Sequence, residues 1–304
     1  MDQNKLDKYL DELIDKAELD IDKMFSKRFK AISGQLGDMY RKYSTKGELT
    51  YSDLMKYNRF QKEMLFISEQ IQEDYKELLS FVQMLMENQY VENYFKSAYL
   101  YEFEAQKKLG YTLLNQTVIT AAVTNPIPQL TLPALMEWNR NDTIRRISNE
   151  IAQGLLAGEG YSNIAKRIEN AVGFSSTKAK RVARTESHRC QVKGRFDSAE
   201  QASKYVEMTK MWDSTLDSHT RPAHRKLDGT VVSKDEDFVS DAGGKGKGPG
   251  HMNNAGDDIN DRCTVLFLVN GNKPSVRRER LEDGKTAIIP YMNYEDWESE
   301  RLKK

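Results

Sequence analysis

The side chains that could perform chemistry gather in one stretch of the chain, residues 211–265. Three of the four histidines (His219, His224 and His251) and one of the two cysteines, Cys263, fall inside it. These types and numbers suit a structural zinc site, which takes four cysteine or histidine ligands. They also suit a nuclease that pairs a histidine base with a metal-binding carboxylate. This stretch is therefore the first candidate for a functional site.

The spacing of these residues argues against a zinc site. His219 and His224 lie five positions apart in a turn that contains proline, and the chain has no HxxxH or CxxC pair. Since such closely spaced pairs are what make a zinc pattern specific, we expect no metal and no other cofactor. The residues that remain as metal candidates are His224, His251, Asp261 and Cys263.

A metal-dependent nuclease is the alternative function, with Asp217, His224 and Cys263 as its working residues. His219 could replace His224 as the base, and Asp228 could replace Asp217 at the metal. No spacing typical of a nuclease supports this assignment. The GxSxG pattern of serine hydrolases and the HxE and PCxxC patterns of zinc deaminases are also absent. We therefore expect a protein that is not an enzyme.

Residues 242–250 are rich in glycine, as phosphate-binding loops are. The GxxxxGK[ST] pattern of a phosphate-binding loop is absent, so we expect a flexible loop there.

Composition limits where the protein works. Lysine plus arginine and aspartate plus glutamate number 46 each, so the net charge indicates no polyanionic partner. The cysteines, Cys190 and Cys263, form no closely spaced pair, which favours a reducing compartment over a disulfide framework. The N-terminal residues lack the apolar segment of a signal peptide, and no apolar run could span a bilayer. We expect a soluble intracellular protein without a membrane partner.

Periodic apolar residues predict long helices in the first 110 residues. One helix face has its apolar residues three or four positions apart: Leu6, Leu10, Leu13, Ala17, Ile21 and Met24. Gly34, Gly37 and Gly47 are expected to loosen the chain. A second helix should begin at a cap formed by Thr50 or Ser52 and run to about residue 88. We predict a helical N-terminal arm over residues 1–116.

An aromatic run closes this arm: Tyr90, Tyr94, Phe95, Tyr99, Tyr101 and Phe103. Such residues could stack on nucleic-acid bases, but glutamates rather than arginines separate them. We expect a surface for packing or for contact with another protein.

A proline-rich, uncharged segment over residues 117–132 predicts a linker, because proline removes a backbone donor and disfavours helix before it. Helical periodicity resumes over residues 133–207. Between residues 178 and 195, seven basic residues stand against the single acid Glu186: Lys178, Lys180, Arg181, Arg184, Arg189, Lys193 and Arg195. Either these residues form a solvated helix face or they contact DNA phosphates without reading sequence.

Residues 208–304 predict a small α+β domain, so the fold class as a whole is α+β. Residues 227–231 (LDGTV) are typical of a hairpin turn between strands. The Asp217 carboxylate could accept hydrogen bonds from backbone N–H groups of its own turn. The Arg221 guanidinium could form a bidentate ion pair with a carboxylate from another part of the chain.

Four motifs together resemble the head morphogenesis family of tailed phages, whose members are minor capsid proteins similar to the phage Mu F protein. They are ARTE at 183–186, WxxxxDSxTRxxH at 212–224, LDG at 227–229 and INxRCT at 259–264. The resemblance covers roughly residues 133–297. Its closing segment also resembles that of family members, with RRxR at 277–280 and YEDW at 294–297. The positions that match the family's signature are Trp212, Asp217, Thr220, Arg221, His224, Asp228, Gly229, Asn260, Arg262 and Cys263.

Two positions depart from the family's pattern. His219 stands where the family commonly has arginine, and Asp261 stands where it commonly has the first cysteine of a CxC pair. The second change argues further against a zinc site, although aspartate can itself bind zinc. The alternative is a buried polar network of Asn260, Arg262, Asp217 and His224 that fixes a small fold.

The resemblance implies a minor head protein that acts in procapsid assembly and in DNA packaging or delivery. Its implied partners are the phage portal protein, with scaffold or major capsid protein as further candidates, and double-stranded DNA bound without sequence preference. Its implied place is the virion, in the capsid interior or at the portal vertex, after assembly in the host cytoplasm.

Overall fold

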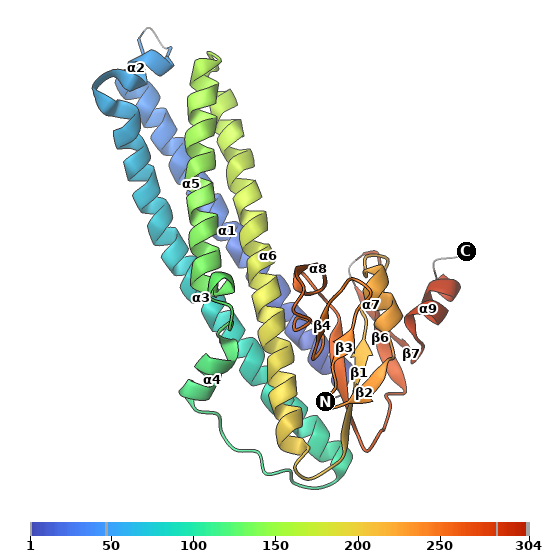
Figure 1. The fold of residues 1–304 in the computed structure, drawn as a ribbon. Coiled ribbons are helices and arrows are strands. Elements are labelled where there is room, and N and C mark those ends of the chain that lie inside the picture. The colour runs from blue at the N-terminus through green and yellow to red at the C-terminus, as the bar shows by residue number, and fades with distance from the viewer. Residues whose placement is uncertain (1, 46–47, 284, 302–304) are drawn as a thin grey trace. The chain divides into compact units, whose positions relative to one another are not determined.

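The computed structural model describes residues 2–45, 48–283 and 285–301 and confirms an α+β fold (Figure 1). The chain forms two compact units, each built from separate segments. Unit 1 comprises Met1–Ile14, Leu85–Thr124 and Arg184–Lys304, and unit 2 comprises Asp15–Met84 and Asn125–Ala183. This division differs from the predicted boundaries at residues 117, 133 and 208, because the longest helices contribute residues to both units.

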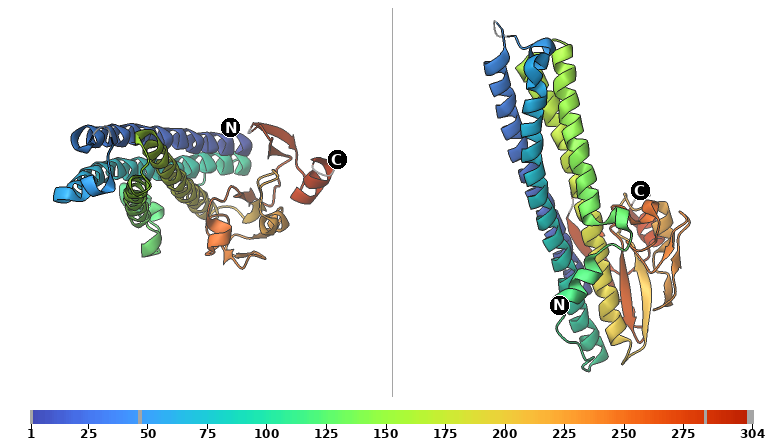
Figure 2. Two further views of the ribbon diagram at one scale, coloured as in Figure 1. Left: turned by 90° about the horizontal axis from the view of Figure 1, so that it is seen from above. Right: turned by 60° about the vertical axis from the view of Figure 1, so that its left-hand side comes forward.

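Unit 2 is a bundle of helical segments that run side by side (Figures 1 and 2). They belong to α1 (Gln3–Tyr43), α3 (Arg59–Ala105), α5 (Leu132–Leu156) and α6 (Tyr161–Ala202). Buried polar contacts join the helices. The hydroxyls of Tyr75 on α3 and Thr143 on α5 are 2.9 Å apart, and Lys178 on α6 donates to Asp142 on α5 at 2.9 Å.

The first helix continues through two of the glycines that were expected to interrupt it. Helix α1 contains both Gly34 and Gly37 and ends at Tyr43. A glycine inside a helix costs about 1 kcal/mol relative to alanine. The buried side chains of Leu36 and Met39 offset that cost here by packing. The third glycine, Gly47, lies outside the described residues.

The predicted cap at Thr50 is confirmed, but the helix after it is interrupted. Thr50 and Asp53 form a capping box at the start of α2 (Tyr51–Met55). A short 3₁₀ helix, η1 (Lys56–Asn58), follows, with Tyr57 at a φ of 58°. Helix α3 then runs without a break through the aromatic residues to Ala105.

Most of the aromatic run serves packing. Tyr90, Tyr94 and Tyr101 are buried, whereas Tyr99 and Phe103 are exposed and stack on each other with ring centroids 6.4 Å apart. The run therefore contributes an interior face and one exposed aromatic pair.

The predicted linker contains regular structure. Residues 116–123 form α4 (Gln116–Val123), whose first turn is capped by the Asn115 side chain accepting from Val118 N at 2.9 Å. A 3₁₀ turn, η2 (Pro128–Leu130), leads into α5. Proline prevents one continuous helix, as predicted, but does not prevent these short ones.

Unit 1 contains the strands. A central antiparallel sheet has the order β2-β1-β5, formed by Val231–Ser233, Met208–Asp213 and Thr264–Val269. Two-stranded ladders pair β3 (Phe238–Val239) with β4 (Lys245–Gly246), and β6 (Val276–Arg280) with β7 (Thr286–Pro290). Short helices α7 (Pro222–Leu227), α8 (Ala255–Asp258) and α9 (Tyr294–Arg301) complete the unit.

The predicted hairpin at residues 227–231 is wrong. Asp228 and Gly229 connect helix α7 to strand β2, and Gly229 has a φ of 73° that favours glycine. The residues 242–250, expected to be a flexible loop, include the β4 ladder strand. A Cβ on Gly246 would lie 1.8 Å from the His251 carbonyl oxygen, so close backbone approach explains this glycine.

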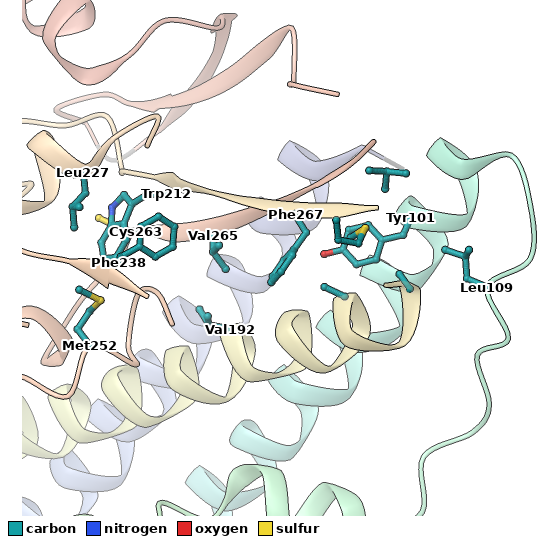
Figure 3. Packing of buried hydrophobic residues seen from close by; sticks show 14 residues of the cluster. Tyr101, Leu109, Val192, Trp212, Leu227, Phe238, Met252, Cys263, Val265 and Phe267 are labelled. Carbon is teal, nitrogen blue, oxygen red and sulfur yellow. The ribbon is translucent and has the colours of Figure 1, made fainter. Parts of the chain in front are cut away.

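The core of unit 1 is shared between the sheet and two long helices (Figure 3). On β5, Val265 and Phe267 face a cluster that also contains Val192 of α6 and Tyr101 of α3. The Tyr101 and Phe267 rings meet edge to face at 6.4 Å. Segments from the N-terminal half of the chain thus complete the core of the C-terminal α+β region.

Helices α3 and α6 approach closely within unit 1. A Cβ on Gly194 of α6 would lie 2.3 Å from the Tyr90 carbonyl oxygen of α3. Glycine is therefore required at this crossing.

Among the described helices, none combines the length and the apolar character that crossing a membrane requires.

Candidate functional site

The signature residues begin where strand β1 ends. Trp212 is fully buried, and its ring meets the His224 ring edge to face with centroids 5.1 Å apart. The Trp212 Nε1 donates to Ser214 Oγ at 3.1 Å, and that hydroxyl donates to the His224 carbonyl at 2.7 Å. Strand β1 and helix α7 are thereby fixed to each other through polar groups inside the core.

Asp217 organises the turn before α7. Its carboxylate accepts from His219 N at 2.9 Å and from Thr220 Oγ1 at 3.1 Å, as predicted for a capping aspartate. Both oxygens also accept from the guanidinium of Arg262. Arg221, expected to bind a carboxylate, instead donates to the carbonyls of Asp257 and Ile259.

Asp228 is a second anchor of the network. Its carboxylate accepts from Ser214 N and Tyr294 N, each at 2.7 Å. Arg277, whose side chain is 3% exposed, donates to the two oxygens at 2.8 and 3.0 Å. This carboxylate joins the end of β1, the strand β6 and the start of α9.

His224 lies between two buried carboxylates. Its Nε2 is 3.1 Å from Asp257 Oδ1, and its Nδ1 is 3.3 Å from Asp261 Oδ1 and 3.4 Å from Cys263 Sγ. Burial alone would lower the pKa of His224, but the hydrogen bonds and charges of Asp261 and Asp257 outweigh it and raise the pKa. Two states fit this geometry: an imidazolium held by the carboxylates, or a neutral ring beside a bound cation.

The pKa values of Asp261 and Cys263, the two residues beside His224 Nδ1, are also shifted. Burial by itself would raise the pKa of the Asp261 carboxyl. The hydrogen bond with His224 has the larger effect together with nearby positive charge, so the pKa is lowered overall. Burial and the charge of Asp261 raise the pKa of the Cys263 thiol well above its ordinary value. In the absence of a cation, Cys263 is thus a neutral thiol.

The structure groups three of the four metal candidates. The ligand atoms of His224, Asp261 and Cys263 lie within 4.8 Å of one another, and all three residues are buried. His251 is held elsewhere, its Nε2 lying 2.9 Å from the Arg189 carbonyl oxygen. The nuclease set of Asp217, His224 and Cys263 is not assembled as such, because Asp217 is bound by Arg262 and Asp261 takes its place beside His224.

Asn260 differs from the other residues of the predicted polar network. It is exposed and has a φ of 55°, and its backbone N–H donates to Thr185 Oγ1 at 3.0 Å. Its position in the signature is explained by this left-handed backbone conformation, which asparagine tolerates better than most residues.

The seven basic residues of the predicted DNA-binding helix do not form one exposed face. Arg195 is fully buried, and Arg189 is buried beside Glu186, to which its Nε donates at 2.9 Å. Lys178, Lys180 and Lys193 are partly buried and donate to Asp142, Asp22 and Asp197, and Arg184 is partly buried as well. Of the seven, only Arg181 is exposed. Buried Arg189 and Arg195 cannot meet DNA phosphates in this conformation.

A different group of basic residues surrounds a cavity beside His224. This cavity of about 370 Å³, here called the arginine pocket, is lined by Arg184, Arg221, Arg262 and Arg280 together with His219 and Asn260. His224, Asp261 and Cys263 also line it. Its lining combines four guanidinium groups with the single carboxylate of Asp261, and one of the four, that of Arg262, is paired with Asp217.

Comparison with known proteins identifies the family of the chain. The family model described as phage Mu protein F like protein matches residues 145–266. The chain is 50% identical to the minor head protein GP7 of Bacillus phage SPP1 over 299 residues, which cover 98% of this chain and 97% of the relative. The chain belongs to the phage Mu F-like family of minor head proteins. It is accordingly a phage head component with a role in head morphogenesis, and its place is the virion.

This minor head protein also resembles part of an enzyme. It is 29% identical over 214 residues to the NAD(+)--arginine ADP-ribosyltransferase EFV of Enterococcus faecalis strain ATCC 700802 / V583. The similarity covers 70% of the minor head protein but only 43% of the transferase. No solved structure gives a significant match.

Several residues of the minor head protein's polar network were not singled out from the sequence. Asp257, Ser214 and Arg277 each hold a signature residue in place. Arg277 and Tyr294 lie in the RRxR and YEDW segments that carried the resemblance, so a signal was present for them. Asp257 and Ser214 had no signal of their own, because their roles depend on contacts distant in sequence.

Proposed function

We propose that this minor head protein acts in procapsid assembly at the portal vertex and contacts DNA there during packaging or delivery. The observation that carries the proposal is the 50% identity to a phage minor head protein along 98% of the chain. The partners would be the portal protein, with scaffold or major capsid protein as further candidates. Assembly would take place in the host cytoplasm, and the protein would remain in the capsid interior or at the portal vertex.

The portal contact is proposed for the helical part of the chain, through the exposed aromatic pair Tyr99 and Phe103. These side chains are 53% and 62% exposed, and aromatic residues are enriched where proteins meet. Truncating the N-terminal 110 residues would not test this contact, because Tyr101 and Leu109 belong to the core of unit 1. Point variants at the surface are needed.

The experiment is co-purification of the full chain with the portal protein of the same phage. The double variant Tyr99→Ser and Phe103→Ser should lose most of the portal recovered with the wild-type chain. Leu156→Ser, a change at another residue that is 67% exposed, serves as the control and should retain it. Equal recovery with all three proteins would contradict the proposed contact surface.

The DNA contact is proposed for the arginine pocket of unit 1, with exposed Arg181 of unit 2 as a separate candidate. Phosphate binding releases counterions, so binding to unrelated duplexes should weaken steeply as salt rises. Removing one phosphate contact should lower the slope of log affinity against log salt by about 1.

Four variants separate the two candidate surfaces. Arg184→Gln and Arg280→Gln test the pocket, Arg181→Gln tests the helix, and Lys166→Gln alters an exposed lysine outside both. A reduced slope in the pocket variants alone would assign the contact to the pocket. A salt-independent affinity, or no binding at low salt, would contradict any phosphate contact.

We further propose that the chain is not an enzyme. The transferase similarity leaves more than half of that protein unmatched, so its activity is not carried over to this chain. The metal-dependent nuclease is tested by incubating purified protein with plasmid and magnesium, manganese or zinc. Cleavage that disappears in His224→Ala would overturn the non-enzymatic proposal.

A further inference from the structure

The distances from His224 Nδ1 to the two other ligand atoms match those around a bound metal, and all three atoms lie within 4.8 Å of one another. Nδ1 of His224 lies 3.4 Å from Cys263 Sγ and 3.3 Å from Asp261 Oδ1. In a tetrahedral zinc site with metal–nitrogen and metal–oxygen bonds of about 2.0–2.1 Å and metal–sulfur bonds of about 2.3 Å, neighbouring ligand atoms are about 3.3–3.6 Å apart. The sequence hides this arrangement, since His224 comes from α7 and the other two residues precede β5.

The His224 ring is held in the orientation that a metal ligand needs. Its Nε2 faces Asp257 Oδ1 at 3.1 Å, and the same carboxylate oxygen accepts from Ser240 Oγ at 2.9 Å. When Nε2–H donates to Asp257, the lone pair of Nδ1 points to Asp261 and Cys263. A carboxylate behind a histidine is the usual outer partner of histidine ligands, fixing both tautomer and ring orientation.

A buried carboxylate oxygen at this point lacks a partner. Asp261 is 3% exposed, and its Oδ1 accepts from Arg262 N at 2.7 Å and from Cys263 N at 3.0 Å. Its Oδ2 is buried and has no hydrogen-bond partner in the part of the chain that the structure describes. Leaving such an oxygen unsatisfied is costly, and a cation held by both oxygens of the Asp261 carboxylate would satisfy it.

We propose that His224 Nδ1, the Asp261 carboxylate and the Cys263 thiolate bind one zinc-class transition metal ion. The thiolate and the carboxylate balance a charge of two, so the occupied site can be buried without a net charge. Binding releases the thiol proton of Cys263 to solvent. The ligand set of sulfur, nitrogen and oxygen favours zinc over magnesium, which prefers oxygen ligands.

The site opens onto the arginine pocket. All three ligands line the arginine pocket, which gives the ion a path of entry and leaves a fourth coordination position for water. Once bound, the ion would tie helix α7 to the residues that lead into β5.

The experiment uses the full chain after removal of metals by a chelator. Zinc or cobalt is added, excess ion is removed, and the metal content is measured. We expect one equivalent of metal per wild-type chain and, with cobalt, the charge-transfer absorption of a thiolate ligand. Added zinc should bleach the cobalt absorption and raise the midpoint of thermal unfolding.

Cys190 provides a matched control, because it is the other cysteine of the chain and is also buried. Cys190→Ser should keep the metal and the cobalt absorption, whereas Cys263→Ser should lose both. Asp261→Asn should bind metal at least 10-fold more weakly, with circular dichroism verifying that both site variants remain folded. Absence of stoichiometric metal in the wild-type chain, or a thiolate absorption that survives in Cys263→Ser, would refute the site.

Discussion

Replacing Arg195 with methionine should destabilise the fold rather than weaken DNA binding. The guanidinium is fully buried and pairs with the Asp7 carboxylate. It also donates to Thr264 Oγ1 at 2.7 Å and to the Val265 carbonyl at 2.9 Å. The side chain therefore joins α6 to the start of α1 and to strand β5 within unit 1.

The magnitude follows from what the substitution leaves behind. Removing one partner of a buried ion pair costs about 3–5 kcal/mol, because the other charge stays buried without compensation. Asp7 lines a small cavity of about 60 Å³, which gives water some access to its carboxylate. We therefore expect Arg195→Met to lower the free energy of unfolding by about 3 kcal/mol, the lower end of that range.

Urea unfolding followed by circular dichroism measures this loss as a change in the free energy of unfolding. Arg181→Met changes an exposed arginine of the same helix and should alter it by less than about 0.5 kcal/mol. The double variant Asp7→Leu and Arg195→Met removes both charges and should recover at least about 1 kcal/mol relative to Arg195→Met alone. If Arg195→Met and Arg181→Met were equally stable, the buried-pair argument would be wrong.

Three further perturbations probe unit 1. Gly194→Ala should destabilise it by about 1–3 kcal/mol, because the added Cβ would lie 2.3 Å from the Tyr90 carbonyl oxygen and the helices would have to separate. Acid should destabilise the fold through His251, since burial lowers its pKa to about 4. This contribution to stability is complete above the unfolded pKa of about 6.5 and is lost as pH falls towards 4, at most about 3 kcal/mol. Asp228→Ala should cost about 3 kcal/mol, because the Ser214 and Tyr294 N–H groups lose their acceptor and the buried Arg277 guanidinium keeps only one of its two carboxylate partners, Asp213.

Each perturbation has a control. Gly173→Ala changes a glycine of α6 with nothing near its Cβ, so it should be neutral or stabilising. If it cost as much as Gly194→Ala, helix crowding would be the wrong explanation. For His251, the Gln variant should show a flatter loss of stability between pH 6.5 and 4, and an unchanged profile would assign the acid sensitivity to other groups. Asp241→Ala removes an exposed carboxylate paired with Lys226 and should change stability little beside Asp228→Ala.

Local patterns in the sequence determined the helices, one cap and the family. Apolar residues three and four positions apart place Leu6, Leu10 and Ile21 on one buried helix face, as the structure confirms. Thr50 and Asp53 are close enough in sequence to define their capping box. The same holds for Asp217, whose turn contacts span only two and three residues. Such features depend on short-range geometry, which the order of residues specifies.

Contacts between distant residues decided the rest. A run of basic residues gives no sign that Arg195 lies inside the core, because its partners Asp7 and Val265 are 188 and 70 positions away. Likewise, His224 meets Asp261 and Cys263 only because α7 packs against the residues preceding β5. The spacing of these residues along the chain does not match a zinc motif, so the sequence predicted no metal site. Burial and three-dimensional distance, which the sequence does not express locally, bring its ligand atoms together.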